Sequence, residues 1–369
     1  MNANRFPNDP GGVFCAFELP KFGLTWAGAN PFGEGFCVGS ESGKIVLLTA
    51  EFQARSKELP ASAAGEPVNS VAFSQHWLAV TTRKDINFIG PFKEPKRPPE
   101  MVSFSGGGHD VIVAPTSGQF VISLGPDGVM FVKPGIGEND PVTISKSEKS
   151  GLNFCRALAL PGERGNDVIV CAGRRGGIGY TEYREGIRGH TLHTATFKDL
   201  DLVDVCSVAT PEKPLAVVAA AKDGSMVLFD NILSDKAPKT IKFKGVKGTV
   251  YRILSTQGDI YLLTSKGLFG LFRLATRFLD GGRLHASNTD ILRLPIAAAD
   301  ANLVGQKWLL AAEDDIVLRF DLEKMPKSPE NGAIAHKDDS REEPVQIMTQ
   351  PQWDESSFEQ TSACMAGAV

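Results

Sequence analysis

The stretch KDGSMVLFD, from Lys222 to Asp230, begins as a tight turn and continues as an apolar run that ends on an aromatic residue and an aspartate. The apolar run LAVVAAA comes directly before it. Gly224 lies in the turn, at a position where a positive φ angle selects Gly, Asn or Asp. The stretch therefore predicts a β-hairpin with one strand on each side of Gly224.

The hairpin pattern recurs along the chain with a period of roughly 40 to 50 residues. An apolar run, a turn position and a second apolar run occur around Gly43, Asp85, Gly128, Gly177, Gly224, Gly267 and Asp315. Most hairpins follow a further short apolar segment, such as SVAFS, DVIVAP, RALALP, DVCSVAT or YRILST, and a weaker segment such as HTATF comes after the hairpin. Four short strands per period are typical of a β-propeller blade, which cannot bury both of its faces alone.

The predicted fold class is therefore all-β, a seven-bladed β-propeller of four-stranded antiparallel blades. We expect residues 1–12 to form a leader, residues 13–326 the propeller and residues 327–369 a polar C-terminal tail. The last blade lacks an outer strand, and a free sheet edge favours aggregation. We expect the segment VFCAFELP, from Val13 to Pro20, to supply this strand. The alternative is PVQIMTQ, from Pro344 to Gln350.

The repeats resemble those of the WD-repeat β-propellers over about residues 13–326. DGSMVLFD has Phe229 and Asp230 where that family carries its Trp-Asp pair, DDIVLRFD repeats the pattern, and GGGHDVIVAP has a Gly-His pair before a first strand. The resemblance implies that His109 joins a buried hydrogen-bond network with Asp127, the turn aspartate of its own blade. It also implies a wide rigid rim and the usual role of this family, a non-catalytic scaffold for protein interactions.

The composition predicts a soluble cytoplasmic protein. The chain has 369 residues, a net charge of −4 and six cysteines, none of which form a CxxC pair. The N-terminus has no basic segment followed by an apolar core, and no run of about 18 apolar residues occurs, so no membrane contact is expected. Four cysteines fall in apolar runs, where a reduced thiol packs as a small hydrophobe. We expect buried free thiols at Cys37, Cys155, Cys171 and Cys206.

Candidate sites for chemistry are few. The stretch GRRGGIG, Gly173 to Gly179, is glycine-rich but lies in a predicted hairpin turn, without the helix N-terminus that would bind a phosphate. His190 and His193 are three residues apart, which on a strand places them on opposite faces and not around one metal ion. No residue beside His109 completes a recognised catalytic arrangement. We expect no catalytic residue, no metal and no cofactor.

Three classes of function fit this fold. The favoured one is a non-catalytic scaffold or adaptor, a subunit of a complex that binds another protein with the propeller rim. The alternative is a propeller-type hydrolase or lactonase with its site at the central channel. Such an enzyme needs polar residues at the blade starts, whereas SVAFS, DVIVAP and RALALP are mostly apolar. A nucleic-acid-associated subunit ranks lower, because the net charge is mildly negative.

The candidate partner-binding residues lie in the turns between second and third strands, which gather on one face in the resembled family. This basic arc consists of Arg83, Lys84, Arg174, Arg175, Lys222 and Lys266. Acidic residues share the face, namely Glu41, Asp127, Asp223, Asp314 and Asp315. We expect the arc to bind an acidic surface or peptide of another protein, with Arg174 and Arg175 at its centre. The alternative is a solvated rim without a binding role.

The segment from Lys327 to Val369 is rich in charged residues, Ser, Gln and Pro, so it is not expected to fold alone. One interpretation is a disordered tail. The other is a docking peptide within QPQWDESSFEQ, with Trp353 and Phe358 as its anchors.

Overall fold

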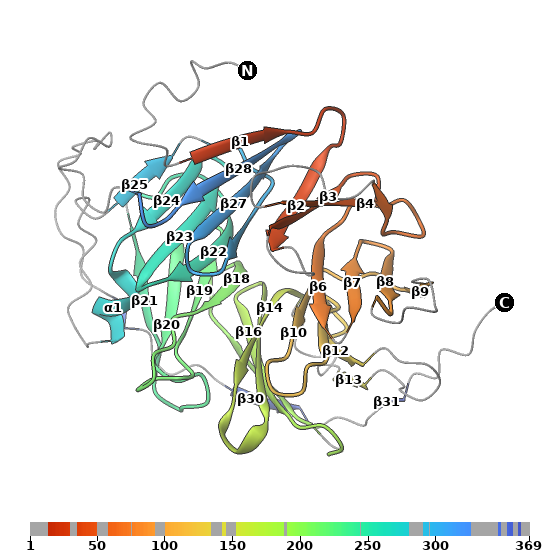
Figure 1. The fold of residues 1–369 in the computed structure, drawn as a ribbon. Helices are drawn as coiled ribbons and strands as arrows, with labels where there is room; N and C mark the ends of the chain where they lie inside the picture. Colours follow the sequence, from red (N-terminus) through yellow and green to blue (C-terminus); the bar gives the residue numbers. More distant parts are fainter. Residues whose placement is uncertain are drawn as a thin grey trace.

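Seven antiparallel sheets surround a common centre in the computed structural model of the chain (Figure 1). Each sheet is one blade, and successive strands of the sequence run from its innermost position outward. The predicted fold class, an all-β seven-bladed propeller, is therefore confirmed. The structure describes residues 14–29, 35–49, 58–74, 76–92, 100–133, 142–144, 153–187, 190–243, 245–279, 291–294, 296–325, 346–347, 353–356 and 361–362.

From the innermost strand outward, blade 1 contains β2 (Leu24–Ala29), β3 (Phe36–Ser40), β4 (Lys44–Leu48) and β5 (Leu59–Pro60). Blade 2 contains β6 (Ser70–Ser74), β7 (Trp77–Thr81), β8 (Asp85–Gly90) and β9 (Glu100–Ser105). Blade 3 contains β10 (Asp110–Val113), β11 (Phe120–Ser123), β12 (Val129–Val132) and β13 (Val142–Ile144). Blade 4 contains β14 (Asn153–Pro161), β15 (Asp167–Arg174), β16 (Gly177–Tyr183) and β17 (Leu192–Thr196).

Blade 5 contains β18 (Leu202–Ser207), β19 (Val217–Ala221), β20 (Ser225–Phe229) and β21 (Lys239–Lys242). Blade 6 contains β22 (Val250–Thr256), β23 (Asp259–Thr264), β24 (Gly267–Leu271) and β25 (Ile291–Leu294). Blade 7 begins with β26 (Asp300–Val304), β27 (Trp308–Glu313) and β28 (Ile316–Asp321). The described chain also has two short helical segments, the 3-10 turn Glu163–Gly165 and α1 (Leu274–Leu279).

The N-terminal strand β1 (Phe14–Glu18) closes the ring by completing blade 7. All five of its residues pair antiparallel with β28. The backbone N–H of Leu19 donates a further hydrogen bond of 2.7 Å to the carbonyl oxygen of Asp315. The alternative segment lies elsewhere, because β29 (Gln346–Ile347) pairs with β21 of blade 5. The expected N-terminal closure is confirmed.

Three short C-terminal strands pair with the outer strands of three blades. β29 pairs with β21, β30 (Trp353–Ser356) with β17 and β31 (Thr361–Ser362) with β13, so they follow blades 5, 4 and 3 in that order. Of the two expected anchors, Trp353 begins β30 and Phe358 lies outside the described residues. The division of the chain at residues 12 and 326 stays a prediction.

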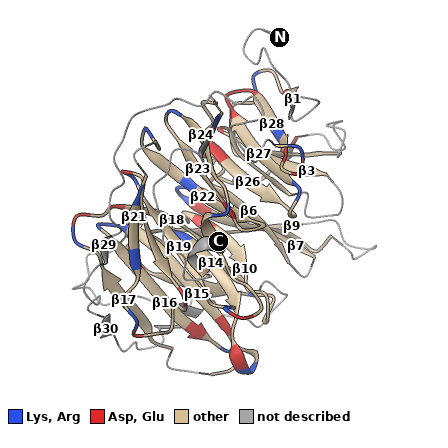
Figure 2. Cartoon of the chain, turned by 90° about the vertical axis from the view of Figure 1, so that its left-hand side faces the viewer, with Lys and Arg blue, Asp and Glu red and all other residues tan. Residues whose placement is uncertain are grey.

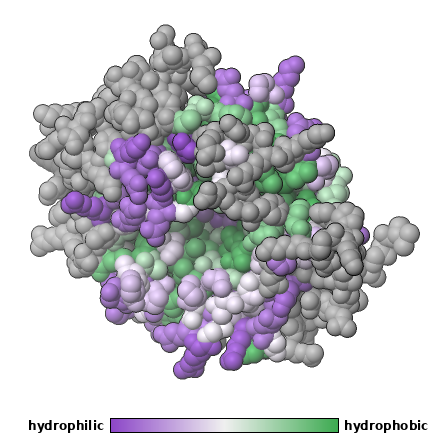
Figure 3. Space-filling view, in the orientation of Figure 1, coloured by the Kyte–Doolittle hydropathy of each residue, from purple (hydrophilic) through white to green (hydrophobic). Residues whose placement is uncertain are grey.

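The hydrophobic core is divided among the interfaces between blades. Residues of blades 5 and 6 form one buried cluster, and residues of blades 4 and 5 form another. All five residues of β19 are buried, as expected for a strand covered on both faces. In Figure 3, apolar side chains are visible between separate groups of hydrophilic ones. Val170, Val217 and Ile260, which lie in the second strands of blades 4, 5 and 6, are 0% exposed.

Replacing Ile260 by alanine is expected to lower the free energy of unfolding by about 2 to 4 kcal/mol. The side chain is fully buried in the second strand of blade 6, so its removal leaves a cavity between two sheets. Denaturant unfolding measures the loss. The matched control is Ile187→Ala, because Ile187 is 49% exposed, and its truncation is expected to change stability by less than about 0.5 kcal/mol. Equal losses in both variants would contradict this strand register.

The turns between second and third strands lie where the sequence predicts them, but they do not all use the predicted residue for a positive φ angle. Gly43, Gly128, Gly224 and Gly267 have φ angles of 71°, 94°, 88° and 132°. In blade 4 the left-handed residues are Arg175 and Gly176, and in blade 7 it is Asp314. Asp85 is not left-handed, and its carboxylate instead accepts a 2.9 Å hydrogen bond from the backbone N–H of Ala64. Predicting positive φ at Asp85, Gly177 and Asp315 is therefore wrong.

Candidate interaction face

One face of the ring carries both the turns between second and third strands and the starts of the innermost strands, and we call it the turn face. The strand register shows why. The first residues of innermost strands lie opposite the last residues of second strands, for example Asp110 opposite Ser123 and Val250 opposite Thr264. Side chains from different blades therefore converge on this face at the mouth of the central channel.

The basic arc predicted from the sequence lies on the turn face. Five of its six residues are exposed, and Lys222 is half-buried. Two of them have local partners, since Lys84 pairs with Glu66 and Lys222 with Asp201, the latter at 2.6 Å. Within the described part of the chain, no ion pair involves the other four, which are Arg83, Arg174, Arg175 and Lys266. Their role in binding a partner stays a prediction.

Charge is distributed unevenly along the arc. In the turn of blade 5, Asp223 forms an ion pair with Lys242 at 2.6 Å. Together with the Lys222–Asp201 pair, this pair neutralises the charges of the blade 5 turn. The unpaired arginines belong to blades 2 and 4. Figure 2 shows basic and acidic segments interspersed over the side of the molecule that it presents.

His109 lies among the arginines between these two blades. Partial burial lowers the pKa of the His109 ring, and the guanidinium groups of Arg174, Arg156 and Arg83 lower it further. The ring is therefore neutral at pH 7 and does not repel a cation or pair with an anion as a charged group would. The expected hydrogen bond between His109 and Asp127 does not occur among the described residues, so this expectation is wrong. Instead, the His109 ring lies against Gly125, and its backbone N–H donates to Ser123 at 2.8 Å.

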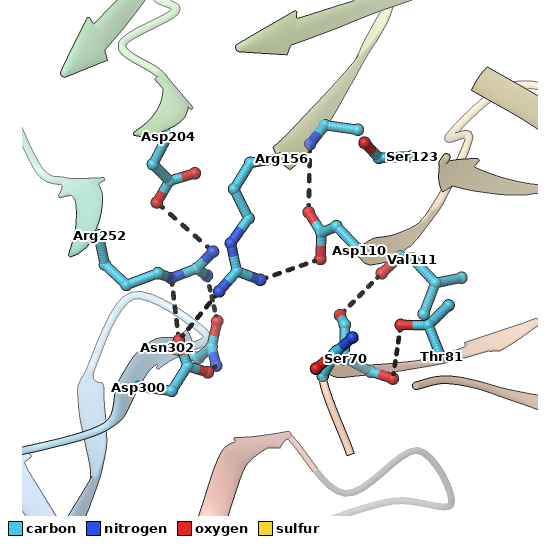
Figure 4. A network of polar contacts seen from close by, with 12 residues as sticks. Ser70, Thr81, Asp110, Val111, Ser123, Arg156, Asp204, Arg252, Asp300 and Asn302 are labelled. Atoms are coloured by element: carbon cyan, nitrogen blue, oxygen red, sulfur yellow. Dashed lines mark hydrogen bonds and ion pairs between the residues drawn. The ribbon is translucent and has the colours of Figure 1, made fainter. Parts of the chain in front are cut away.

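Charged side chains from the innermost strands of five blades form a network of ion pairs near the centre of the ring (Figure 4). Arg156 of blade 4 occupies the middle of this network. One of its terminal nitrogens lies 3.3 Å from a carboxylate oxygen of Asp110 in blade 3, and the other 3.5 Å from a carboxylate oxygen of Asp300 in blade 7. Arg156 therefore connects blades that are not neighbours in the ring.

Arg252 of blade 6 forms the second half of the network. Its Nη1 lies 3.4 Å from Oδ2 of Asp204 in blade 5, and its Nε lies 3.2 Å from Oδ1 of Asp300. Its Nη2 donates to the side-chain oxygen of Asn302 at 2.5 Å, and Asn302 donates in turn to the carbonyl oxygen of Ala27 in blade 1 at 2.8 Å. The network thus extends to the blade that follows the ring closure.

Three carboxylates face two guanidinium groups in this network, and the carboxylates of Asp110, Asp204 and Asp300 are at most 7% exposed. Burial raises the pKa of Asp204 and of Asp300, more than the guanidinium groups of Arg252 and Arg156 lower them. Burial alone would lower the pKa of Arg156, but the surrounding carboxylates raise it. The network is therefore held by mutual pairing of groups that are costly to bury singly.

Sequence reasoning missed this network, because it treated the innermost strands as apolar. That interpretation is wrong for the residues that face the channel mouth. The signal was present, since DVIVAP, RALALP and DVCSVAT each begin with Asp or Arg at the same place in the blade. What the pattern could not show is the pairing, which joins Arg156 to a carboxylate 144 positions away.

Four innermost strands also contain a β-bulge near the turn face. The pairing register shifts by one residue in β2, β14, β18 and β22. A bulge leaves one residue out of the ladder and redirects its side chain. Cys155 is such a residue, so it is half-buried rather than buried as predicted, while Cys37, Cys171 and Cys206 are buried free thiols as expected.

The remaining candidates have structural surroundings. Gly177 begins β16, so the glycine-rich stretch forms the turn between β15 and β16. His193 stacks on Tyr180 and His190 packs on Tyr183, each with ring centroids 4.7 Å apart. Among the described residues, no group of three or more His, Cys, Asp or Glu side chains is placed to hold a metal ion. No helix in the same residues has the length and apolar character needed to cross a membrane.

Comparison with solved structures identifies the same architecture. The β-propeller domain of Cps50 (Swd1) from Myceliophteria thermophila superposes with a TM-score of 0.59 at 13% identity, over 84% of this chain and 100% of that domain. The WD40 β-propeller domain of Doa1 gives a TM-score of 0.59 at 13% identity, over 85% of this chain and 98% of that domain. No protein-family model and no curated protein matches the sequence. The chain therefore has the fold of WD-repeat propellers.

Proposed function

We propose that the protein is a non-catalytic scaffold or adaptor in a cytoplasmic complex, and that its turn face binds an acidic surface or peptide of a partner protein. The fold supports a role in protein interaction in general, since WD-repeat propellers usually serve as interaction scaffolds. The cytoplasmic placement is supported by the free cysteines of the described chain.

The observation that carries the proposal is a difference between two sets of charges on one face. In the channel, Arg156 and Arg252 are committed to carboxylates of other blades. In the turns, Arg174 and Arg175 are exposed, and no ion pair is described for them. Exposed arginines on a rigid turn can form bidentate contacts with carboxylates, and complementary charge accelerates association.

The hydrolase alternative is less well supported. It requires carboxylates that are free to hold a metal ion or transfer a proton at the channel mouth. Asp110, Asp204 and Asp300 do lie there, but each is already hydrogen-bonded or ion-paired to a residue of a neighbouring blade. A hydrolase and lactonase screen with the purified protein tests this alternative directly.

Reversing the charge of Arg174 and Arg175 to Glu is expected to weaken partner binding by tenfold or more, about 1.4 kcal/mol. Both side chains are exposed, so the melting temperature should hardly change. The readout is quantitative affinity capture of the partner from the native cell at physiological salt, followed by a binding constant for the purified pair.

The matched control reverses Arg164 and Arg184, two exposed arginines of the same blade at the end of the sheet away from the turn face. It changes the net charge by the same amount and is expected to leave capture intact. Equal capture by both double variants would refute the proposed site. If the bound material is nucleic acid, with affinity that falls steeply with salt, the third class of function would replace the scaffold.

A further inference from the structure

A hollow of about 480 Å³ opens on the turn face where blades 6, 7 and 1 meet. This volume lies in the range of pockets that bind small ligands, roughly 300 to 1,000 Å³. Ala297, Ala298 and Ala299 line it, in the connection from β25 to β26, and their short side chains leave space that longer ones would fill. The hollow is outside the basic arc and separate from the paired charges of the channel.

Tyr251 forms an aromatic wall of the hollow and is 42% exposed. It is the residue that the bulge of β22 leaves out of the ladder, between Val250 and Arg252. The equivalent bulge residues in other blades are Thr25, Cys155 and Val203, so the bulge itself does not require an aromatic side chain. Placing a large ring at this exposed position therefore has no explanation in the backbone geometry.

Two exposed carboxylates stand at the same hollow. Glu41 comes from the turn of blade 1 and Asp314 from the turn of blade 7. None of the residues that line the hollow is Lys or Arg, and no ion pair of Glu41 or Asp314 occurs within the described chain. Both carboxylates are therefore available to a cation from outside.

The wall between these carboxylates is held by hydrogen bonds. The carboxylate of Asp315 accepts the backbone N–H groups of Lys21 and Gly23, at 2.9 and 2.7 Å. The carbonyl oxygen of Asp314 accepts the N–H of Leu24 at 2.7 Å. The turn of blade 7 is thus tied to the connection that follows β1, so the hollow is formed before any ligand binds.

We propose that this hollow binds an arginine side chain from a partner protein. The guanidinium plane would stack on the ring of Tyr251, where a cation is attracted to the π face. Glu41 and Asp314 would neutralise its charge, and the alanines would contact its aliphatic stem. The inference rests on the proposed scaffold function, because the partner protein of that scaffold supplies the arginine. It gives the partner two features, acidic groups that face the arc and an arginine that enters the hollow.

The test uses full-length protein and two probes, N-acetyl-arginine amide and its neutral isostere N-acetyl-citrulline amide. Ligand-detected saturation-transfer NMR measures binding of each in a titration. The arginine amide is expected to bind saturably with Kd on the order of 1 to 10 mM, as for one desolvated cation–π contact with flanking carboxylates. The citrulline amide is expected to show no saturable binding over the same range.

Variants locate the probe. Tyr251→Ala and Asp314→Asn are each expected to weaken binding of the arginine amide at least fivefold, whereas Tyr251→Phe keeps the ring and should retain affinity within about twofold. Asn tolerates the left-handed backbone of Asp314, which has φ 48°, so the turn should persist. Equal binding of the two amides, unchanged binding by Tyr251→Ala, or no saturation by the arginine amide would each overturn the inference.

The arc variant separates this inference from the proposed function. Arg174→Glu/Arg175→Glu is expected to leave binding of the arginine amide unchanged while weakening capture of the partner. If the arginine amide binds as inferred but the arc variant still captures the partner, the proposed contact between the basic arc and an acidic partner is refuted and the arginine site is supported. If the arc variant no longer captures the partner but the arginine amide does not bind, the arginine site is refuted and the proposed scaffold function is supported.

Discussion

Deletion of residues 1–18 is expected to abolish recovery of soluble folded protein. The deletion removes β1, the outer strand of blade 7, and leaves the N–H and C=O groups of β28 unpaired at an open edge. It also removes the connection between blades 1 and 7, because β1 continues along the chain into β2 and pairs with β28. A propeller gains its stability from the closed ring, because each blade buries its faces only against two neighbours.

The matched control deletes residues 1–12 and keeps all of β1. We expect this variant to be recovered in the soluble fraction and to melt at the temperature of the full chain. Size-exclusion chromatography and thermal unfolding compare the two deletions. Similar yield and similar melting temperature for both would show that β1 does not close the ring.

Replacing Arg156 by methionine is expected to lower the free energy of unfolding by about 3 to 5 kcal/mol at pH 7, because it leaves buried carboxylates without a partner. Asp110 and Asp300 both contact Arg156 and are nearly inaccessible to solvent. Denaturant unfolding measures the loss. The double variant Arg156→Met/Asp110→Asn should lose less than the sum of the single changes, because the amide removes a charge and still accepts the N–H of Ala157. Strict additivity would show that the two side chains do not interact.

The loss in Arg156→Met is expected to depend on pH. Burial raises the folded-state pKa of Asp204 and Asp300 above the ordinary value of 3.8, and Arg156 opposes that rise. Without Arg156 the folded chain binds protons at these groups at a higher pH than the unfolded chain does. Stability from such groups is present below the unfolded pKa and is lost as pH rises through the folded pKa. The deficit relative to the parent protein should therefore shrink as pH falls from 7 toward about 5. A deficit that stays constant would place the cost in packing alone.

The ring could be predicted from the sequence because it is built from hairpins whose sequence pattern is local and repeats along the chain. Each hairpin carries its own turn residue and two apolar runs, as around Gly224, and the spacing of the hairpins sets the number of blades. Closure by β1 followed from counting strands, since blade 7 had no fourth strand of its own.

The candidate sites were less predictable because they depend on neighbours across the ring. Arg83, Arg174 and Arg175 were found as charges in turns, but the pairing of Lys84 with Glu66 and of Lys222 with Asp201 needed the structure. In the channel, a single charged residue at the start of a strand does not reveal which blade supplies its partner. The exposure of Tyr251 could not be predicted either. It results from a β-bulge between Val250 and Arg252, and the apolar pattern of YRILST does not indicate that bulge.

The most direct test of the central claim, that a partner protein binds the turn face, is photocrosslinking in the native cell. A benzophenone amino acid is placed at Arg175 on the turn face or, as the matched control, at Arg164 in the same blade on the opposite face. Both positions are exposed and both have φ 63°, so they tolerate the substitution equally. We expect a discrete protein adduct from position 175 and none from position 164. An adduct from position 164 without one from position 175 would place the partner on the other face and contradict the account.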